Sequence, residues 1–312
     1  MAARLQTVCA ACGAGPLRPH LRVAGDMGAE GLVPTTDRFG TALADVVRCE
    51  ACGHMQLASM PADAVLAEAY EEASSDDYVE EEAGQRATAA GVLASVEAHV
   101  RARPRPDLSA GSPPAPRLLD LGCWVGFLLA EAGDRGWAAV GVEPSEFASG
   151  YARSRGLDVR TEDLFEADLP ASSFDAVVLG DVIEHLPRPG DALDRIAGLL
   201  APGGILALMV PDAGSRLARA MGRRWWSVIP THVQYFTRDS LRTLLERHGY
   251  AVVEVGTQPK AFTVRYYLSR ISGYSPPLGR ALVGAAERIG VAERMWAPDF
   301  RDRMLVMARG PE

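Results

Sequence analysis

Basic residues are scarce in this sequence relative to acidic ones. The 312 residues include 32 Lys and Arg against 40 Asp and Glu, which gives a formal net charge of −8. A protein that follows a nucleic acid backbone needs an excess of Lys and Arg to neutralise the phosphates. The charge balance therefore argues against a nucleic-acid substrate and favours a small molecule.

Long apolar runs are also missing. No stretch approaches the ~20 apolar residues that a membrane-spanning helix requires. The N-terminus, "MAARLQTVCAACG", lacks the apolar core of a secretory signal peptide. These absences predict a cytoplasmic protein with no membrane partner, and they leave a homo-oligomer open.

Cysteine is sparse too, but four of the five residues form two C-x-x-C pairs, Cys9 with Cys12 and Cys49 with Cys52. In a reducing compartment, pairs with this spacing indicate metal ligation rather than disulfides. Each pair is followed by glycine, as in the two knuckles of a zinc ribbon. The pairs therefore predict a structural Zn²⁺ site that folds a small module, with His54 as a surface residue.

Composition and periodicity divide the chain into three segments. Residues 1–60 hold the cysteine pairs and short apolar strands, which predicts a zinc-ribbon-like module. Residues 61–114 combine helical apolar spacing with the stretch "RARPRPDLSAGSPPAPR", which predicts a helical segment and an irregular linker. Residues 115–312 alternate strand-like and helical runs, with a helical insert over about 259–297. This alternation predicts an α/β fold whose parallel sheet is covered on both faces.

Acidic side chains follow three successive predicted strands. The first strand leads into the loop "LLDLGCWVG", with Asp120, Gly122 and Gly126; the second ends at Glu143 and the third at Asp163. Ligands of open α/β sheets bind beyond the carboxyl ends of the strands, where an acid such as Glu143 can accept both hydroxyls of a ribose. Asp163 is positioned to accept from an adenine amino group. Helix capping explains one such acid but not three in succession.

The segments "LLDLGCWVGFLL", "GVEPS", "TEDL", "SFDAVVLGDVIEHL" and "LLAPGGILALMVP" resemble, in order, the motifs of class I S-adenosylmethionine-dependent methyltransferases. The similarity is closest to the branch of ubiquinone-type O-methyltransferases and of sugar and natural-product methyltransferases. It implies a Rossmann-like seven-stranded sheet, a helical lid over 61–114 and S-adenosylmethionine as cofactor. The reaction expected is methylation of a small molecule, an O-methylation of a sugar, polyketide or other secondary metabolite, which requires no catalytic metal.

The resemblance also assigns a cofactor site. Asp120, Gly122, Cys123 and Gly126 would surround the methionine part, Glu143 with Pro144 and Ser145 the ribose, Asp163 and Leu164 the adenine, and Gly180 and Asp181 the methionine amino end. The family usually has glycine where this chain has Trp124. Because S-adenosylmethionine has no pyrophosphate to lie on the loop, one fewer close backbone approach is needed, and we expect Trp124 to pack under the sulfonium or to line the pocket.

Two histidines are candidates for proton transfer, His185 in "DVIEHL" and His232 in "IPTHVQYF". Methylating a hydroxyl requires loss of a proton, and histidine has a suitable pKa. Each also has a structural interpretation, as a helix cap or as a packed ring. The neighbouring aromatic residues have the same two interpretations, as an apolar substrate wall or as core; they are Trp225, Trp226, Tyr235 and Phe236.

Two other functions stay open at this point. An RNA methyltransferase with a zinc module would share these motifs, although the acidic balance disfavours it. A non-catalytic protein could bind a partner through the ribbon while Trp124 blocks a degenerate cofactor pocket. Calorimetry with the cofactor separates the last alternative from an enzyme, since a blocked pocket gives no heat of binding.

Overall fold

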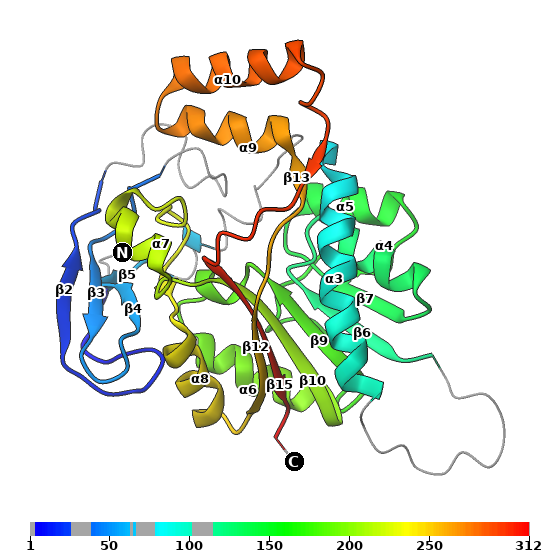
Figure 1. Cartoon of the computed structure of the whole chain (residues 1–312). Helices are drawn as coiled ribbons and strands as arrows, with labels where there is room; N and C mark the ends of the chain where they lie inside the picture. Colours follow the sequence, from blue (N-terminus) through cyan, green and yellow to red (C-terminus); the bar gives the residue numbers. More distant parts are fainter. Residues whose placement is uncertain (1–3, 26–38, 63–64, 67–78, 102–114, 312) are drawn as a thin grey trace.

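The computed structural model describes residues 4–25, 39–62, 65–66, 79–101 and 115–311 (Figure 1). Its centre is a seven-stranded sheet in the order β12-β15-β10-β9-β6-β7-β8. The strands are β6 (Arg117–Leu121), β7 (Ala138–Val142), β8 (Val159–Arg160), β9 (Phe174–Gly180), β10 (Leu200–Pro211), β12 (Ala251–Thr257) and β15 (Arg303–Arg309). The pairings β6–β7, β7–β8, β6–β9 and β9–β10 are parallel, whereas β15 runs antiparallel to β10 and β12. The seven-stranded Rossmann-like sheet predicted from the sequence is confirmed.

Helices cover both faces of this sheet. On one face lie α3 (Glu82–Arg101), α4 (Phe127–Asp134) and α5 (Glu146–Ser154); on the other lie α6 (Pro189–Leu199) and α8 (Arg238–Arg247) (Figure 1). Alternate strand residues point to opposite faces, so Leu118 packs toward α3 while Leu119 packs toward α6. This two-sided burial explains why the strands read as continuous apolar runs.

The N-terminal cysteine segment forms a second, four-stranded sheet in the order β11-β4-β3-β2. Three strands come from this segment: β2 (Leu17–Leu21), β3 (Val46–Cys49) and β4 (Met55–Leu57). The edge strand β11 (Gln234–Tyr235) comes instead from the segment after β10, and it pairs antiparallel with β4. A further pair joins β1 (Arg4–Leu5) to β5 (Ser59–Met60). Through β4, the described residues of the N-terminal segment are thus hydrogen-bonded to the rest of the chain.

A helical insert separates β12 from β15, over the top of the molecule in Figure 1. It contains β13 (Phe262–Thr263), α9 (Val264–Arg270), η3 (Ile271–Gly273), α10 (Pro276–Arg288) and β14 (Met295–Trp296). The two short strands pair with each other and close the insert at its base. Within the described ranges, no helix is both long and apolar enough to cross a membrane.

The connection from β10 to α8 contains α7 (Arg216–Met221), η2 (Gly222–Arg224) and β11. Together with η1 (Ile183–His185), which follows β9, it lies near the carboxyl ends of the parallel strands. The residues assigned to catalysis are on these two segments, because His185 ends η1 and His232 precedes β11.

Candidate functional site

The loop after β6 passes through three left-handed backbone positions. These are Gly122 (φ 70°), Trp124 (φ 50°) and Gly126 (φ 82°). A Cβ at Gly122 would lie 2.5 Å from Cγ2 of Val182, so glycine is needed there for space as well as for conformation. A left-handed backbone costs a residue with a Cβ about 1–2 kcal/mol. The usual glycine at the Trp124 position therefore has a conformational reason that our sequence argument missed.

Trp124 is held in this conformation by Glu143, the residue that follows β7. Its backbone N–H donates to Oε2 of Glu143 over 2.9 Å. The indole ring lies next to Phe147 on α5, with ring centroids 6.4 Å apart. The Trp124 side chain thus packs toward α5, beside the loop.

Glu143 is buried, with 5% of its surface exposed. Oε1 accepts from the backbone N–H of Ser145 over 2.9 Å, so each carboxylate oxygen already has one donor and retains a lone pair for a ligand. Burial raises the pKa of Glu143, and these two N–H donors only partly offset the effect. Burial also raises the pKa of the neighbouring Asp120 to about 7, with a further contribution from the charge of Glu143. Two buried carboxyl groups at the same edge of the sheet suit a ligand that carries hydroxyl groups and a positive charge.

Three more residues assigned to the cofactor belong to the segments that carry this pair: Cys123, Pro144 and Ser145. Cys123 is buried, and burial followed by the charges of Asp120 and Glu143 raises its thiol pKa. Ser145, which follows Pro144, caps α5 by accepting from the N–H of Ala148. Contacts with a cofactor stay a prediction for all of them.

The predicted adenine residues lie in the turn after β8. Asp163 is exposed, and its Oδ1 accepts from the backbone N–H groups of Phe165 and Glu166. Leu164 is half-buried and packs against the core. Strand β8 ends at Arg160, earlier than the sequence suggested, so Asp163 shapes the turn rather than ending the strand.

Gly180 ends β9, and Asp181 follows it with a positive φ of 57°. The Asp181 carboxylate forms ion pairs with Lys260, over 2.6 Å, and with Arg303. Burial alone would raise the pKa of Asp181, but the two cations outweigh it and lower the pKa. Sequence reasoning missed both cations. Because β15 is antiparallel, its first residue, Arg303, lies at the same sheet edge as the last residues of β9 and β10.

His185 and His232 lie side by side, with ring centroids 4.6 Å apart. Nδ1–H of His185 donates to the carbonyl of Thr231 over 3.0 Å, and Nδ1–H of His232 to the carbonyl of Ser227 over 2.8 Å. Because a carbonyl can only accept, the neutral ring of His232 carries its lone pair on Nε2. Burial lowers the pKa of His185 to about 4 and lowers that of His232 as well. Both rings are therefore neutral near pH 7.

Glu184 adds a carboxylate to this pair. It is 1% exposed, and neither side-chain oxygen has a hydrogen-bond partner among the described residues. Burial, with a smaller contribution from Asp181, raises its pKa to about 8. One ligand atom from each of Glu184, His185 and His232 lies within 4.8 Å of the others, and one carboxylate with two imidazoles is a donor set that divalent metals take.

The predicted aromatic wall belongs mostly to the core. Trp225, Tyr235 and Phe236 are each less than 5% exposed, and Trp226 packs edge-on against Phe300. The indole N–H of Trp225 donates to Asp302 over 3.1 Å, which ties this segment to the start of β15.

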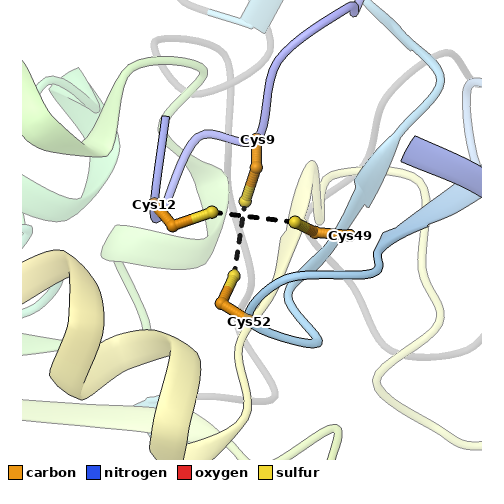
Figure 2. A group of neighbouring side chains, drawn as sticks. All are labelled: Cys9, Cys12, Cys49 and Cys52. Carbon is orange, nitrogen blue, oxygen red and sulfur yellow. Dashed lines mark hydrogen bonds between the residues drawn. The ribbon is translucent and has the colours of Figure 1, made fainter. Parts of the chain in front are cut away.

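The four paired cysteines converge in the N-terminal part (Figure 2). Sγ of Cys9 lies 3.6 Å from Sγ of Cys52, and Sγ of Cys12 lies 3.6 Å from Sγ of Cys49. Tetrahedral zinc with bonds of about 2.3 Å has sulfur–sulfur edges of about 3.8 Å, so the cluster fits the ion. The expectation that His54 is exposed is wrong, because it is fully buried and its Nε2 lies 2.9 Å from Oε1 of Gln234.

Comparison with known proteins identifies the class. The chain belongs to the family of methyltransferase domains, which it matches over residues 95–255. It is similar to the ubiquinone biosynthesis O-methyltransferase of Nitrobacter winogradskyi, with 29% identity over 163 residues, 44% of this chain and 58% of that protein. It is also similar to the C-methyltransferase NovU of Streptomyces niveus, with 30% identity over 135 residues, 42% of this chain and 31% of that protein. The predicted resemblance to class I S-adenosylmethionine-dependent methyltransferases is confirmed.

These curated relatives are matched over less than three fifths of their own length. Among solved structures, a SAM-dependent methyltransferase from Archaeoglobus fulgidus is 17% identical with a TM-score of 0.49, covering 75% of this chain and 100% of that one.

Proposed function

We propose that this protein transfers a methyl group from S-adenosylmethionine to a hydroxyl of a small molecule, such as a sugar, polyketide or other secondary metabolite. The observation that carries the proposal is the buried pair of Asp120 and Glu143 beside a left-handed loop in a member of the methyltransferase family. S-adenosylmethionine supplies a methyl group on a sulfonium that is already a good leaving group. The protein's own contribution is alignment, exclusion of water and acceptance of the acceptor's proton.

In this proposal, Glu143 holds the ribose, and Asp120 with the loop of Gly122, Cys123 and Gly126 surrounds the methionine part. Pro144 and Ser145 shape the turn around the ribose, and Asp163 with Leu164 borders the adenine. Gly180 and Asp181 border the amino end of the methionine.

Calorimetry checks the site: Glu143→Ala should weaken cofactor binding by two charge-assisted hydrogen bonds, about 1.5–3 kcal/mol each. Asp163→Ala should cost less because Asp163 is exposed, and full affinity in both variants would contradict the assignment.

His232 is proposed as the base, with His185 as the alternative, because the two neutral rings lie together and Nδ1–H of His232 donates to a carbonyl, which leaves the lone pair of His232 on Nε2. His232→Ala should lower kcat by roughly 10²- to 10⁴-fold and leave cofactor affinity unchanged, and the residual rate should rise with pH. Single-turnover rates of His185→Ala measured beside it decide which ring acts. Unchanged rates in both variants would mean that the acceptor needs no histidine base.

Glu184 supports a second form of this reaction, in which a divalent cation held by Glu184, His185 and His232 lowers the pKa of the acceptor hydroxyl. Activity lost in EDTA and restored by Mg²⁺ or Mn²⁺ would favour it. Zinc content measured in the same sample would separate this loss from any effect on the cysteine cluster.

We also propose that Cys9, Cys12, Cys49 and Cys52 hold one structural Zn²⁺. A closed set of four thiolates leaves no open coordination position for catalysis. Free thiolate ligands need a reducing compartment, which supports a cytoplasmic location. No nucleic-acid or membrane partner is proposed; a homo-oligomer stays open, and sedimentation of the purified chain would determine it.

A further inference from the structure

A cavity of about 440 Å³ lies where three parts of the chain meet. It is lined by Phe39 and Gly40 from the N-terminal part, Arg223 and Arg224 from η2, and Gly273 and Tyr274 from the helical insert. This volume falls within the range of small-molecule sites, ~300–1,000 Å³. Among the described residues no carboxylate lines it, although acids outnumber bases in the chain. The cavity is therefore a basic site on an acidic protein.

Its two arginines are adjacent and exposed. In the described part of the chain, neither guanidinium takes part in an ion pair or a hydrogen bond. Their backbone is nevertheless fixed, because the hydroxyl of Tyr274 donates to the carbonyl of Arg224 over 2.7 Å. Guanidinium groups bind phosphate oxygens in pairs of parallel hydrogen bonds, so two neighbouring groups on a fixed backbone suit a diphosphate.

Aromatic rings form another wall of the cavity. The rings of Phe39 and Tyr274 lie with centroids 5.0 Å apart and planes at 31°, and Tyr274 is 45% exposed. A large aromatic side chain exposed beside unpaired cations offers a flat surface on which a nucleobase can stack. Arginine and aromatic walls together match a nucleoside diphosphate better than an inorganic anion.

The cavity and the proposed base belong to one short segment. Ser227, whose carbonyl accepts from His232 Nδ1, follows Arg224 by three residues, a span of at most about 11 Å when fully extended. Gly40 on the cavity wall donates its N–H to the carbonyl of Val228 over 2.8 Å. The cavity wall and the carbonyl that holds the His232 ring are thus parts of the same short segment.

We propose that this cavity binds the nucleoside diphosphate part of the acceptor, so that the group to be methylated is carried on a nucleoside diphosphate. The inference deepens the proposed function and rests on it, because it names the class of acceptor for the same reaction. The nucleoside stacks on Tyr274, the diphosphate pairs with Arg223 and Arg224, and the attached group extends toward His232.

Calorimetry on the full chain tests the site with uridine, thymidine and guanosine diphosphates as probes. The double variant Arg223→Gln/Arg224→Gln should lower the affinity for the preferred diphosphate by on the order of a hundredfold. Arg216→Gln, an exposed arginine on α7 outside the cavity, is the matched control and should leave it unchanged. Tyr274→Ala should cost about tenfold through lost stacking, whereas Tyr274→Phe keeps the ring and most of the affinity.

Titration of S-adenosylmethionine into the same samples separates the two proposals. A chain that binds no S-adenosylmethionine refutes the proposed function, whatever the cavity binds. If S-adenosylmethionine binds but no nucleoside diphosphate does, the inference fails alone. It fails as well if the double variant binds the diphosphate like the unchanged chain, or if inorganic pyrophosphate binds as tightly as the nucleoside diphosphates.

Discussion

Asp120 shows at the scale of one residue how a buried acid in the proposed cofactor site lowers stability near neutral pH. The side chain is 4% exposed at the end of β6, beside another buried acid, and its pKa is raised to about 7. A carboxyl group whose folded pKa lies above its unfolded value of 3.8 binds its proton more tightly in the folded state. The stability that it contributes is present below about pH 4 and is lost as the pH rises through 7.

Asp120→Asn should therefore remove a pH dependence. Urea unfolding of the unchanged chain and of this variant is compared between pH 4 and 8. Relative to the variant, the free energy of unfolding of the unchanged chain should fall with rising pH by up to about 1.4 kcal/mol per pH unit. The difference between the two proteins isolates Asp120 from other titrating groups, and two parallel curves would show that its pKa is not raised.

Single residues also show what a sequence can and cannot reveal. The places of Asp120 and Glu143 were predictable, because the apolar runs before them mark strands: Asp120 is the last residue but one of β6, and Glu143 directly follows β7. Their contact with a ligand stays a prediction. Arg303 was not, since the direction of β15 is a property of the sheet and not of its own sequence. His54 was misjudged because its burial depends on Gln234, a residue far away in the chain.

At the scale of elements, the cysteine knuckles are part of a larger core. Cys9 and Cys49 lie in the same buried cluster as Phe236 and as Leu241 and Leu244 of α8. The guanidinium of Arg247, also on α8, donates to the carbonyl of Ala11 between the first two cysteines. C-x-x-C spacing predicts the ligands, but it carries no information on the helix against which they pack.

Cys49→Ser tests the zinc site. Metal analysis of the unchanged chain should give one zinc per chain, and the variant should lose it because a hydroxyl is a far weaker ligand than a thiolate. Its melting temperature should also fall, since the ion contributes to folding. Cys123→Ser removes a buried thiol outside the cluster and should keep its zinc. A zinc-free chain with the stability of the metal-bound protein would rule out a structural ion.

At the scale of the whole molecule, the segment after β10 joins the two sheets. It supplies β11 to the N-terminal sheet, carries His232, and then continues into α8 under the cysteine cluster. Alternating strand and helix patterns made the large sheet predictable from the sequence. The two-residue strand β11 has no such pattern, because it is defined only by its partner β4. The predicted module boundary at residue 60 therefore reflects a change in sequence pattern, whereas the hydrogen bonds between β4 and β11 cross that boundary.

Gln234 provides the last prediction, because its side chain connects the N-terminal part to the segment that follows η1. Oε1 accepts from Nε2 of His54 over 2.9 Å, while Nε2 donates to the carbonyls of Leu186 and Pro187, the two residues after His185. Gln234→Ala leaves these buried groups unpaired and frees the segments that carry both histidines. We expect kcat to fall by roughly tenfold to a hundredfold, since small displacements of catalytic groups are costly, with the affinity for S-adenosylmethionine unchanged.

The matched control for Gln234 is Gln56, an equally buried glutamine in β4. The hydrogen bonds of its side-chain amide stay inside the N-terminal part: Oε1 accepts from the N–H of Ala10, and Nε2 donates to the carbonyl of Val8. Gln56→Ala should therefore weaken zinc retention, whereas Gln234→Ala should keep its zinc and lose turnover. Both variants are also compared at full zinc occupancy. If their kcat values fall equally, any disturbance of the N-terminal sheet affects His185 and His232, and Gln234 is not the specific connection between that sheet and the two histidines.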